Sequence, residues 1–275
     1  MRETEKLVRE RYGVDVPVSD LGNDTLRTIL SHRTCRNYRD QPVSEQTLNL
    51  LLACAQSAPT KSNLQQYSIL IICDPDRRRK LADLVPSMAW LASAPVVLVF
   101  LGDVRRIRKL AETHGHTYQN NNADTFMNAA VDAALAMQNL ITAAESIELG
   151  TCPVSYIRNH IDALAGILDL PDGVFPICGL TLGYPADAGY TAMRLPQNIV
   201  VHKDHYDDRD LEQAVADYDD RSHARFALPP KKQRHTDKYG VLEKCTWSEN
   251  VTRQLSLPER AGFSDYLRRK GISLD

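Results

Sequence analysis

Two short polar stretches decide how this chain is interpreted: His32-Arg33-Thr34-Cys35-Arg36-Asn37-Tyr38 and Pro59-Thr60-Lys61-Ser62-Asn63-Leu64-Gln65-Gln66-Tyr67. In the first, two arginines three residues apart flank a threonine hydroxyl, and such paired planar donors can enclose a phosphate. In the second, hydroxyl, amide and ammonium groups follow a proline turn, as in a loop that presents donors to a polar heterocycle. Taken singly, the first could be a solvated helix start and the second an ordinary loop. The two together, in this order, favour a ligand site.

The composition limits the class of protein. Of the 275 residues, 43% are apolar and 25% charged, which is ordinary for a globular chain with a sizeable core. The formal net charge of −2 gives no long-range reason to expect nucleic acid or an anionic membrane as partner. The first residues are charged, and the longest apolar run, 94–101, is far shorter than the roughly 20 residues of a membrane span. We therefore expect a cytoplasmic protein that does not bind a membrane.

The motifs exclude several kinds of catalytic site. The chain has no GxGxxG, GxxxxGK[ST], GxSxG or HExxH motif, so a redox role must rest on another bound cofactor. His114 and His116 have no acidic or cysteine partners at useful spacing, and we expect loop residues and no metal there. The six cysteines form no CxxC pair and are expected as reduced thiols. Cys35 stands between the arginines, where positive charge would lower its pKa, although a packing role is favoured over redox catalysis.

Hydrophobic periodicity predicts alternating helices and strands. Asp20 or Asn23 is expected to cap an early helix, and Ser44 to open another in a capping-box-like sequence. Helices are expected over 3–12, over 20–31 and from Ser44 to before Pro59, and strands over 67–73, 95–101, 175–184 and 199–202.

Residues 124–149 carry the longest helical signal, and Gly150 is expected to stop this central core helix. Its many alanines suit a helix buried against a sheet and a partner alike. Asp132 and Gln138 are expected as satisfied buried groups and not as ligands. After residue 203 the composition shifts: the acidic stretch 204–220 lacks the pattern of a calcium loop and is interpreted as a solvated helix face.

The chain as a whole resembles the FMN-dependent nitroreductase family. Besides the two opening stretches, the resemblance rests on 132–150, 157–159, 179–186 and 194–196, and it covers roughly 30–202. The tail is similar to that of the longer, NADPH-preferring, oxygen-insensitive nitroreductase and flavin reductase group. The resemblance implies an α+β, three-layer sandwich with a central, mostly antiparallel sheet, in an intertwined homodimer. The implied parts are an N-terminal helical extension (1–30), an FMN-binding core (31–202) and a C-terminal extension that wraps the dimer (203–275).

The resemblance also assigns the site residues. This chain departs from the longer group at two places. Ser155-Tyr156 replaces a Gly-Gly pair that is frequent in the group, which implies narrower substrate access above flavin N5. Ala192 replaces a lysine that is frequent near this position, which removes one positive charge from phosphate binding. The implied roles are phosphate binding by Arg33, Arg36 and Arg194 with help from His32 and Thr34, flavin contacts from the partner by Thr60, Lys61, Ser62 and Asn63, and a backbone amide at Val154, Ser155 and Tyr156 facing flavin N5. For the 2′-phosphate of NADPH the candidates are Lys231, Lys232 and Arg234, with His235 beside them, although this stretch could equally be a solvated loop.

The implied activity is an FMN-dependent NAD(P)H oxidoreductase that reduces nitroaromatics, quinones or free flavin by ping-pong two-electron transfer. NADPH or NADH would be the donor, and no side chain need act as acid or nucleophile. Two alternatives stay open: a reductive dehalogenase or desaturase that uses FMN on a small molecule, and a non-catalytic flavin-binding protein.

Overall fold

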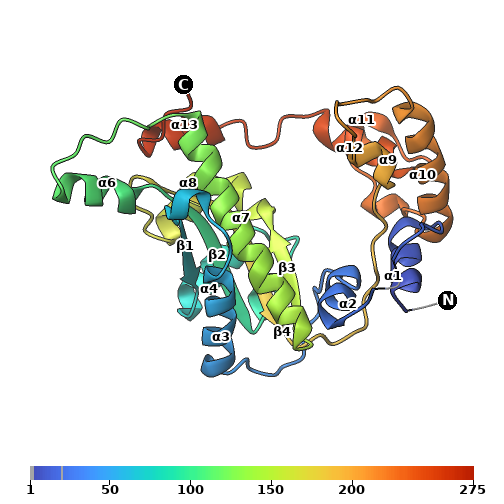
Figure 1. Ribbon diagram of the computed structural model, residues 1–275, viewed down its shortest axis with the longest axis horizontal. Coiled ribbons are helices and arrows are strands. Elements are labelled where there is room, and N and C mark those ends of the chain that lie inside the picture. The colour runs from blue at the N-terminus through green and yellow to red at the C-terminus, as the bar shows by residue number, and fades with distance from the viewer. Residues whose placement is uncertain (1–2, 20) are drawn as a thin grey trace. The chain divides into compact units, whose positions relative to one another are not determined.

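The computed structural model describes residues 3–19 and 21–275, which form two compact units (Figure 1). The larger unit contains residues 32–190 and 260–275, and the smaller contains 1–31 and 191–259. The expected parts 1–30, 31–202 and 203–275 concern how the chain wraps a dimer, and they stay a prediction. None of the described helices is long and apolar enough to cross a membrane.

A four-stranded antiparallel sheet is the centre of the larger unit. Its strands are β1 (Tyr67–Ile71), β2 (Val96–Asp103), β3 (Gly150–Val154) and β4 (Val174–Gly183), in the order β1-β2-β4-β3. The expected strands at 67–73, 95–101 and 175–184 are confirmed to within a few residues. β3 was not expected as a strand, and it contains the exposed Pro153, which is tolerated because β3 lies at the sheet edge.

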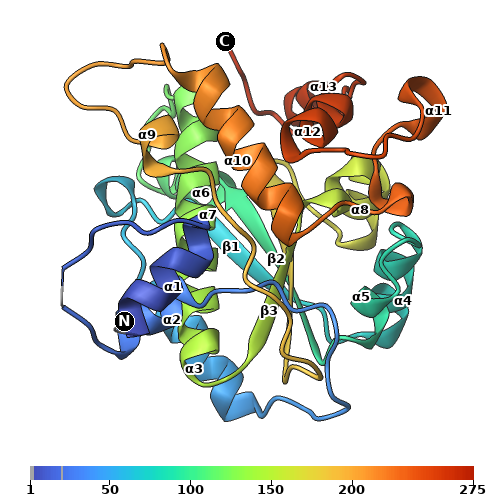
Figure 2. The same cartoon turned by 90° about the vertical axis from the view of Figure 1, so that its right-hand side faces the viewer.

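Strand β2 shows why the unit has three layers. Alternate side chains of a strand point to opposite faces, so Val96, Leu98 and Phe100 join one core, and Val97, Val99 and Leu101 join the other. Figure 2 shows the helices on the two sides of the sheet. The first core includes α3 (Glu45–Gln56) and most of α7 (Ala123–Ser146); the second includes α4 (Pro75–Asp83), α5 (Trp90–Ser93), α8 (Ile161–Ile167) and α13 (Phe263–Arg269). The α+β sandwich is thereby confirmed.

Helix α7 packs on α3 and on the sheet, as expected of a core helix. It begins after Asn122, whose side chain accepts from the Thr125 N–H at 3.1 Å. It ends at Ser146, so Gly150 is not its stop, and that prediction was wrong. The reversal is made by Glu148, whose φ is +63°, and by the Leu149 N–H, which donates to the Ala144 carbonyl at 3.0 Å. Gly150 instead begins β3.

The smaller unit is helical in its described residues. Asn23 caps α2 as expected, whereas Asp20 lies outside the described residues. The strand expected at 199–202 was wrong, because Gln197–Val200 forms a helical turn closed by the Val201 N–H on the Gln197 carbonyl. The helices of this unit are α1 (Glu3–Tyr12), α2 (Asp24–Leu30), α9 (Gln197–Val200), α10 (Leu211–Arg225), α11 (Thr236–Tyr239) and α12 (Trp247–Leu255).

Candidate cofactor-binding site

The arginine stretch lies along strand β3 on a fixed backbone. Thr34 forms a parallel bridge with Thr151, and the Cys35 N–H donates to the Thr151 carbonyl at 2.8 Å. Further along, Tyr38 bridges to Pro185, and its hydroxyl donates to the Cys35 carbonyl at 2.8 Å. The segment that carries both arginines is therefore held between β3 and the residues that follow β4.

Gly150 permits this close approach. A Cβ at this position would lie 2.5 Å from the Cys35 Cβ and 2.8 Å from its sulfur. Contacts this short do not occur between real side chains, so any other residue would push the arginine segment away from β3. The glycine is required by packing.

Arg33 is exposed, and its side chain makes no hydrogen bond or ion pair within residues 3–19 and 21–275. Gly189, with a φ of +60°, packs against it, and a Cβ there would lie 3.2 Å from the Arg33 Cδ. Arg36 is exposed as well. An available guanidinium on a fixed backbone is suited to bind a phosphate.

The thiol between the arginines is not activated. Burial raises the pKa of Cys35, and this effect outweighs the lowering by Arg33 and Arg36. The expectation that positive charge would dominate was wrong in direction, because the side chain points into the fold, where its sulfur lies 3.3 Å from the Asn37 carbonyl. Cys35 fills space at the base of the segment.

His32 is oriented by a carboxylate on helix α7. Its Nδ1 lies 2.7 Å from Oε1 of Glu145, and both side chains are largely covered, with 27% and 13% of their surfaces exposed. Sequence reasoning did not identify Glu145. The only signal was an acidic residue in an otherwise apolar stretch of this helix.

The loop that precedes β1 is held by another α7 carboxylate. Asp132 is 1% exposed and accepts the backbone N–H groups of Lys61 and Gln66, each at 3.0 Å. The expectation that Asp132 is a satisfied buried group is confirmed; Gln138 is exposed in a single chain, and its burial against a partner stays a prediction. In the loop, Lys61, Ser62 and Asn63 are exposed and Thr60 is half-buried.

Strand β3 leads from the arginine segment to the expected flavin-facing residues. Val154 is buried at the strand's end, and the exposed Ser155 and Tyr156 begin a 3₁₀ helix (Ser155–His160). The first N–H groups of a helix have no partner within it, so these amides are placed to donate to a ligand. Ser155 is four residues beyond Thr151, or about 13 Å along an extended strand.

Within the larger unit, the two polar stretches lie apart. The arginine segment and residues 154–156 lie at the β3 edge of the sheet, whereas the 60–66 loop adjoins β1 at the other edge. Arg194 belongs to the smaller unit, where its N–H donates to the Arg11 carbonyl at 2.8 Å. The buried Arg11 in turn donates to the carbonyls of Ala192 and Leu30, which fixes this segment within its unit.

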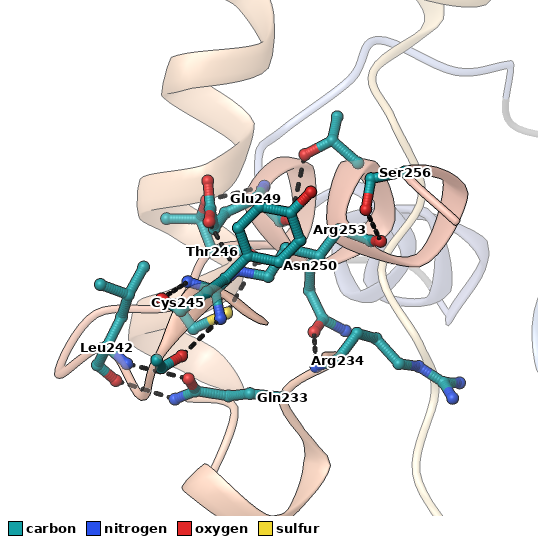
Figure 3. A network of polar contacts seen from close by, with 12 residues as sticks. Gln233, Arg234, Leu242, Cys245, Thr246, Glu249, Asn250, Arg253 and Ser256 are labelled. Carbon is teal, nitrogen blue, oxygen red and sulfur yellow. Dashed lines mark hydrogen bonds and ion pairs between the residues drawn. The ribbon is translucent and has the colours of Figure 1, made fainter. Parts of the chain in front are cut away.

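The candidate 2′-phosphate residues project from a well-ordered turn. Gln233, 8% exposed, donates to the Leu242 carbonyl at 2.8 Å and accepts its N–H at 3.0 Å (Figure 3). The Arg234 N–H donates to Asn250, while the Arg234 guanidinium extends away from this network. The side chains of Lys231, Lys232 and Arg234 are exposed and make no hydrogen bond or ion pair with any other described residue.

A cavity of about 430 Å³ lies elsewhere in the smaller unit. His202 and Tyr206 both line it, with ring centres 4.3 Å apart and ring planes tilted by 35°. Arg209 pairs with Asp207 at 2.6 Å, which lowers the pKa of Asp207 to about 2. Lys203 also lines it. Sequence reasoning missed this cavity, although basic and aromatic residues interrupt the acidic stretch there. No group of three or more metal-ligating side chains occurs in the described part of the chain.

Comparison with known proteins gives the class. Residues 29–184 match the nitroreductase family, and residues 193–275 match the C-terminal domain of that family. The chain belongs to the nitroreductase family.

Relatives and solved structures are similar over nearly their whole length. An FMN reductase (NADPH) of Bacillus subtilis is 32% identical, over 91% of this chain and 99% of that protein. An oxygen-insensitive NADPH nitroreductase of Salmonella typhimurium is 32% identical, over 90% and 97%. The structure of NfrA2 from B. megaterium gives a TM-score of 0.83 at 30% identity, over 92% and 100% of the chains. The NADPH:FMN oxidoreductase of Vibrio harveyi in complex with NAD⁺ gives 0.79 at 28%, over 90% and 98%.

Proposed function

We propose that this chain is an FMN-dependent oxidoreductase that takes hydride from NADPH or NADH and reduces a nitroaromatic, a quinone or free flavin. The names of its relatives, FMN reductase (NADPH) and oxygen-insensitive NADPH nitroreductase, support this reaction class. We also propose that the protein is located in the cytoplasm.

The observation that carries the proposal is the available guanidinium of Arg33 at one end of β3. The path along β3 from Thr151, which pairs with Thr34 beside Arg33, to the exposed Ser155 is about 13 Å, comparable with the length of an extended flavin mononucleotide. One end of this path suits a phosphate, and the other suits the hydrogen-bond acceptors of a flavin ring. The described residues therefore fit FMN.

The roles of the residues follow from this placement. Bound FMN supplies the hydride-transfer chemistry, which protein side chains perform poorly. Arg33 and Arg36 bind the phosphate, with Thr34 beside them and His32 oriented by Glu145. Arg194 joins them by resemblance to the family. A backbone amide at Val154, Ser155 and Tyr156 would face the ring near N5, and none of these residues would need to exchange a proton.

The site is completed by a second copy of the chain, so we propose a homodimer. The 60–66 loop lies at the opposite sheet edge from the arginine segment, and Thr60, Lys61, Ser62 and Asn63 therefore line the partner's flavin. Helix α7 offers a surface for this contact: Met127, Val131 and Leu135 form an apolar stripe, 56%, 48% and 37% exposed. Such a stripe on a central helix is suited to pack against another protein surface.

The test is the visible spectrum of the purified protein, followed by NADPH oxidation with a quinone and with free FMN. A yellow protein that oxidises NADPH only when an acceptor is present supports the proposal. Bound FMN without NAD(P)H oxidation would instead indicate a flavin-binding protein. Loss of halide or formation of a double bond in a small substrate would indicate the dehalogenase or desaturase alternative. A colourless protein that does not retain added FMN contradicts all three.

A further inference from the structure

We propose that Asp132 is a positioning residue for the cofactor, because it holds the 60–66 loop in the shape that presents its side chains. The role toward FMN rests on the function proposed above. The role toward the loop rests on the geometry alone.

Both oxygens of the carboxylate are used. Oδ1 accepts the N–H of Lys61 and Oδ2 accepts the N–H of Gln66, so a single side chain ties together the two ends of the loop. Asp132 forms no ion pair within residues 3–19 and 21–275. A carboxylate that is 1% exposed is costly to bury, and here these backbone donors satisfy it.

The loop has a backbone that needs such support. Ser62, Asn63 and Gln65 have φ angles of +49°, +58° and +50°, in the left-handed region that residues other than glycine disfavour. Left-handed residues persist where the surroundings fix them. The C-terminal end is held further by the Asp103 N–H on the Gln66 carbonyl at 2.9 Å and by Arg106, which donates to the Gln65 carbonyl at 2.8 Å.

The support acts on the backbone and leaves the side chains available. Lys61 and Ser62 make no side-chain hydrogen bond with other described residues, and both are exposed. An alanine at 132, like Ala133 and Ala136 nearby, would suit the packing of α7 without holding the loop. The presence of a carboxylate at position 132 is thus explained by the hydrogen bonds that it accepts from two backbone N–H groups.

The test compares Asp132→Asn with Asn139→Ala. The first keeps the shape but turns one acceptor into an NH₂ group that faces an N–H. The second removes another α7 contact to backbone, the Asn139 donation to the Cys54 carbonyl. In Asp132→Asn we expect the Lys61 and Gln66 amides to exchange hydrogen at least about tenfold faster, and the FMN dissociation constant to rise about ten- to a hundredfold. In Asn139→Ala both should stay within about twofold of the parent while thermal stability falls.

The outcomes separate this inference from the proposed function. Unchanged amide exchange in Asp132→Asn overturns the anchor, and faster exchange with an unchanged FMN dissociation constant overturns the positioning role. If that variant does not fold, exchange in the parent decides: Lys61 and Gln66 amides much slower than those of Ser62 and Asn63 support the anchor, and equal rates overturn it. A parent that does not bind FMN contradicts the proposed function and the role toward FMN, while its amide exchange still decides the anchor.

Discussion

Asp132 and Glu145 lie thirteen residues apart on helix α7, about 20 Å along its axis, and each holds a different part of the candidate site. Asp132 holds the 60–66 loop, and Glu145 orients His32 beside the arginines. Two α7 helices packed antiparallel about a two-fold axis near Gln138 would bring Asp132 close to the partner's Glu145. That arrangement would place the loop of one chain next to the arginine segment of the other.

This geometry predicts that Gln138→Cys will form a disulfide between two chains. The thiols would meet at the axis, within the reach of a disulfide. Met127→Cys is the matched control, because it lies on the same exposed face but eleven residues from the axis, which separates the two thiols by about 33 Å. Non-reducing electrophoresis after mild oxidation measures the product against the parent. Sedimentation should give about twice the mass of one chain. Cross-linking of Met127→Cys alone, or a flavin-loaded monomer, would contradict the arrangement.

Arg33→Ala should give a folded, largely colourless protein. The change removes a charge-assisted phosphate contact worth about 1.5–3 kcal/mol, and Arg194→Ala should act in the same direction. Removing both should abolish retention of FMN. Arg39→Ala, at an exposed arginine just beyond the segment, is the control. The measurement is FMN occupancy after dilution, and full occupancy in both single variants and the double variant would show that phosphate binds elsewhere.

Gly150→Ala should weaken FMN binding and lower stability by about 1–3 kcal/mol, because the new methyl group overlaps Cys35 and displaces the arginine segment. Gly166→Ala is the control, since a Cβ there meets nothing within 4 Å and the helix should gain about 0.5–1 kcal/mol. Urea unfolding and FMN titration check both variants. Equal FMN affinity in the two would mean that the segment does not need its contact with β3.

NADPH should be preferred over NADH if Lys231, Lys232 and Arg234 bind the 2′-phosphate. Replacing all three by alanine should raise KM for NADPH about ten- to a hundredfold and leave NADH nearly unchanged, and the difference should shrink with salt. Lys203→Ala, in the 430 Å³ cavity, is the competing variant. If Lys203→Ala removes the preference and the triple variant does not, the 2′-phosphate binds at the cavity and the 231–234 turn is a solvated connector.

Alkaline pH should destabilise the protein through Cys152. Burial raises the pKa of this thiol from 9.0 to about 11. Between those values the unfolded chain loses the proton while the folded chain keeps it, so stability falls as pH rises, by up to about 3 kcal/mol. Cys152→Ala should flatten the dependence of urea-unfolding free energy on pH above 9, whereas Cys73→Ala, at an exposed cysteine, should not. Parallel profiles for all three proteins would contradict the assignment.

The sequence predicted the elements whose periodicity is strong, such as α7 and the buried strand β2. It failed where local signals conflict with tertiary contacts. Ile199-Val200-Val201 has the composition of a strand but forms a helical turn. Pro153 argued against a strand at 150–154, although an edge strand such as β3 tolerates a proline. Gly150 suggested a helix stop because glycine often has that role. A glycine is required at this position because Cys35, distant in sequence, packs against it.

Parts of the candidate site were predictable for similar reasons. The arginines and the 60–63 loop are contiguous motifs, and a resemblance can be read from them. Asp132 and Glu145, which hold those motifs, lie tens of residues away, and no local pattern connects them. The pKa of Cys35 was misjudged because sequence shows neighbouring charges but not burial.

The anchoring of the 60–66 loop through its backbone has a consequence for how this protein can change. Asp132 accepts hydrogen bonds from backbone N–H groups, which every residue except proline has. Substitutions at Lys61 and Ser62 therefore alter the chemistry of the loop while its two ends stay in place. The shape of the loop and its recognition of a ligand then depend on different residues. Asp132 maintains the shape, and the exposed side chains of Lys61 and Ser62 determine the recognition. Substitutions at these two positions can therefore be selected for a new electron acceptor without any change in the fold.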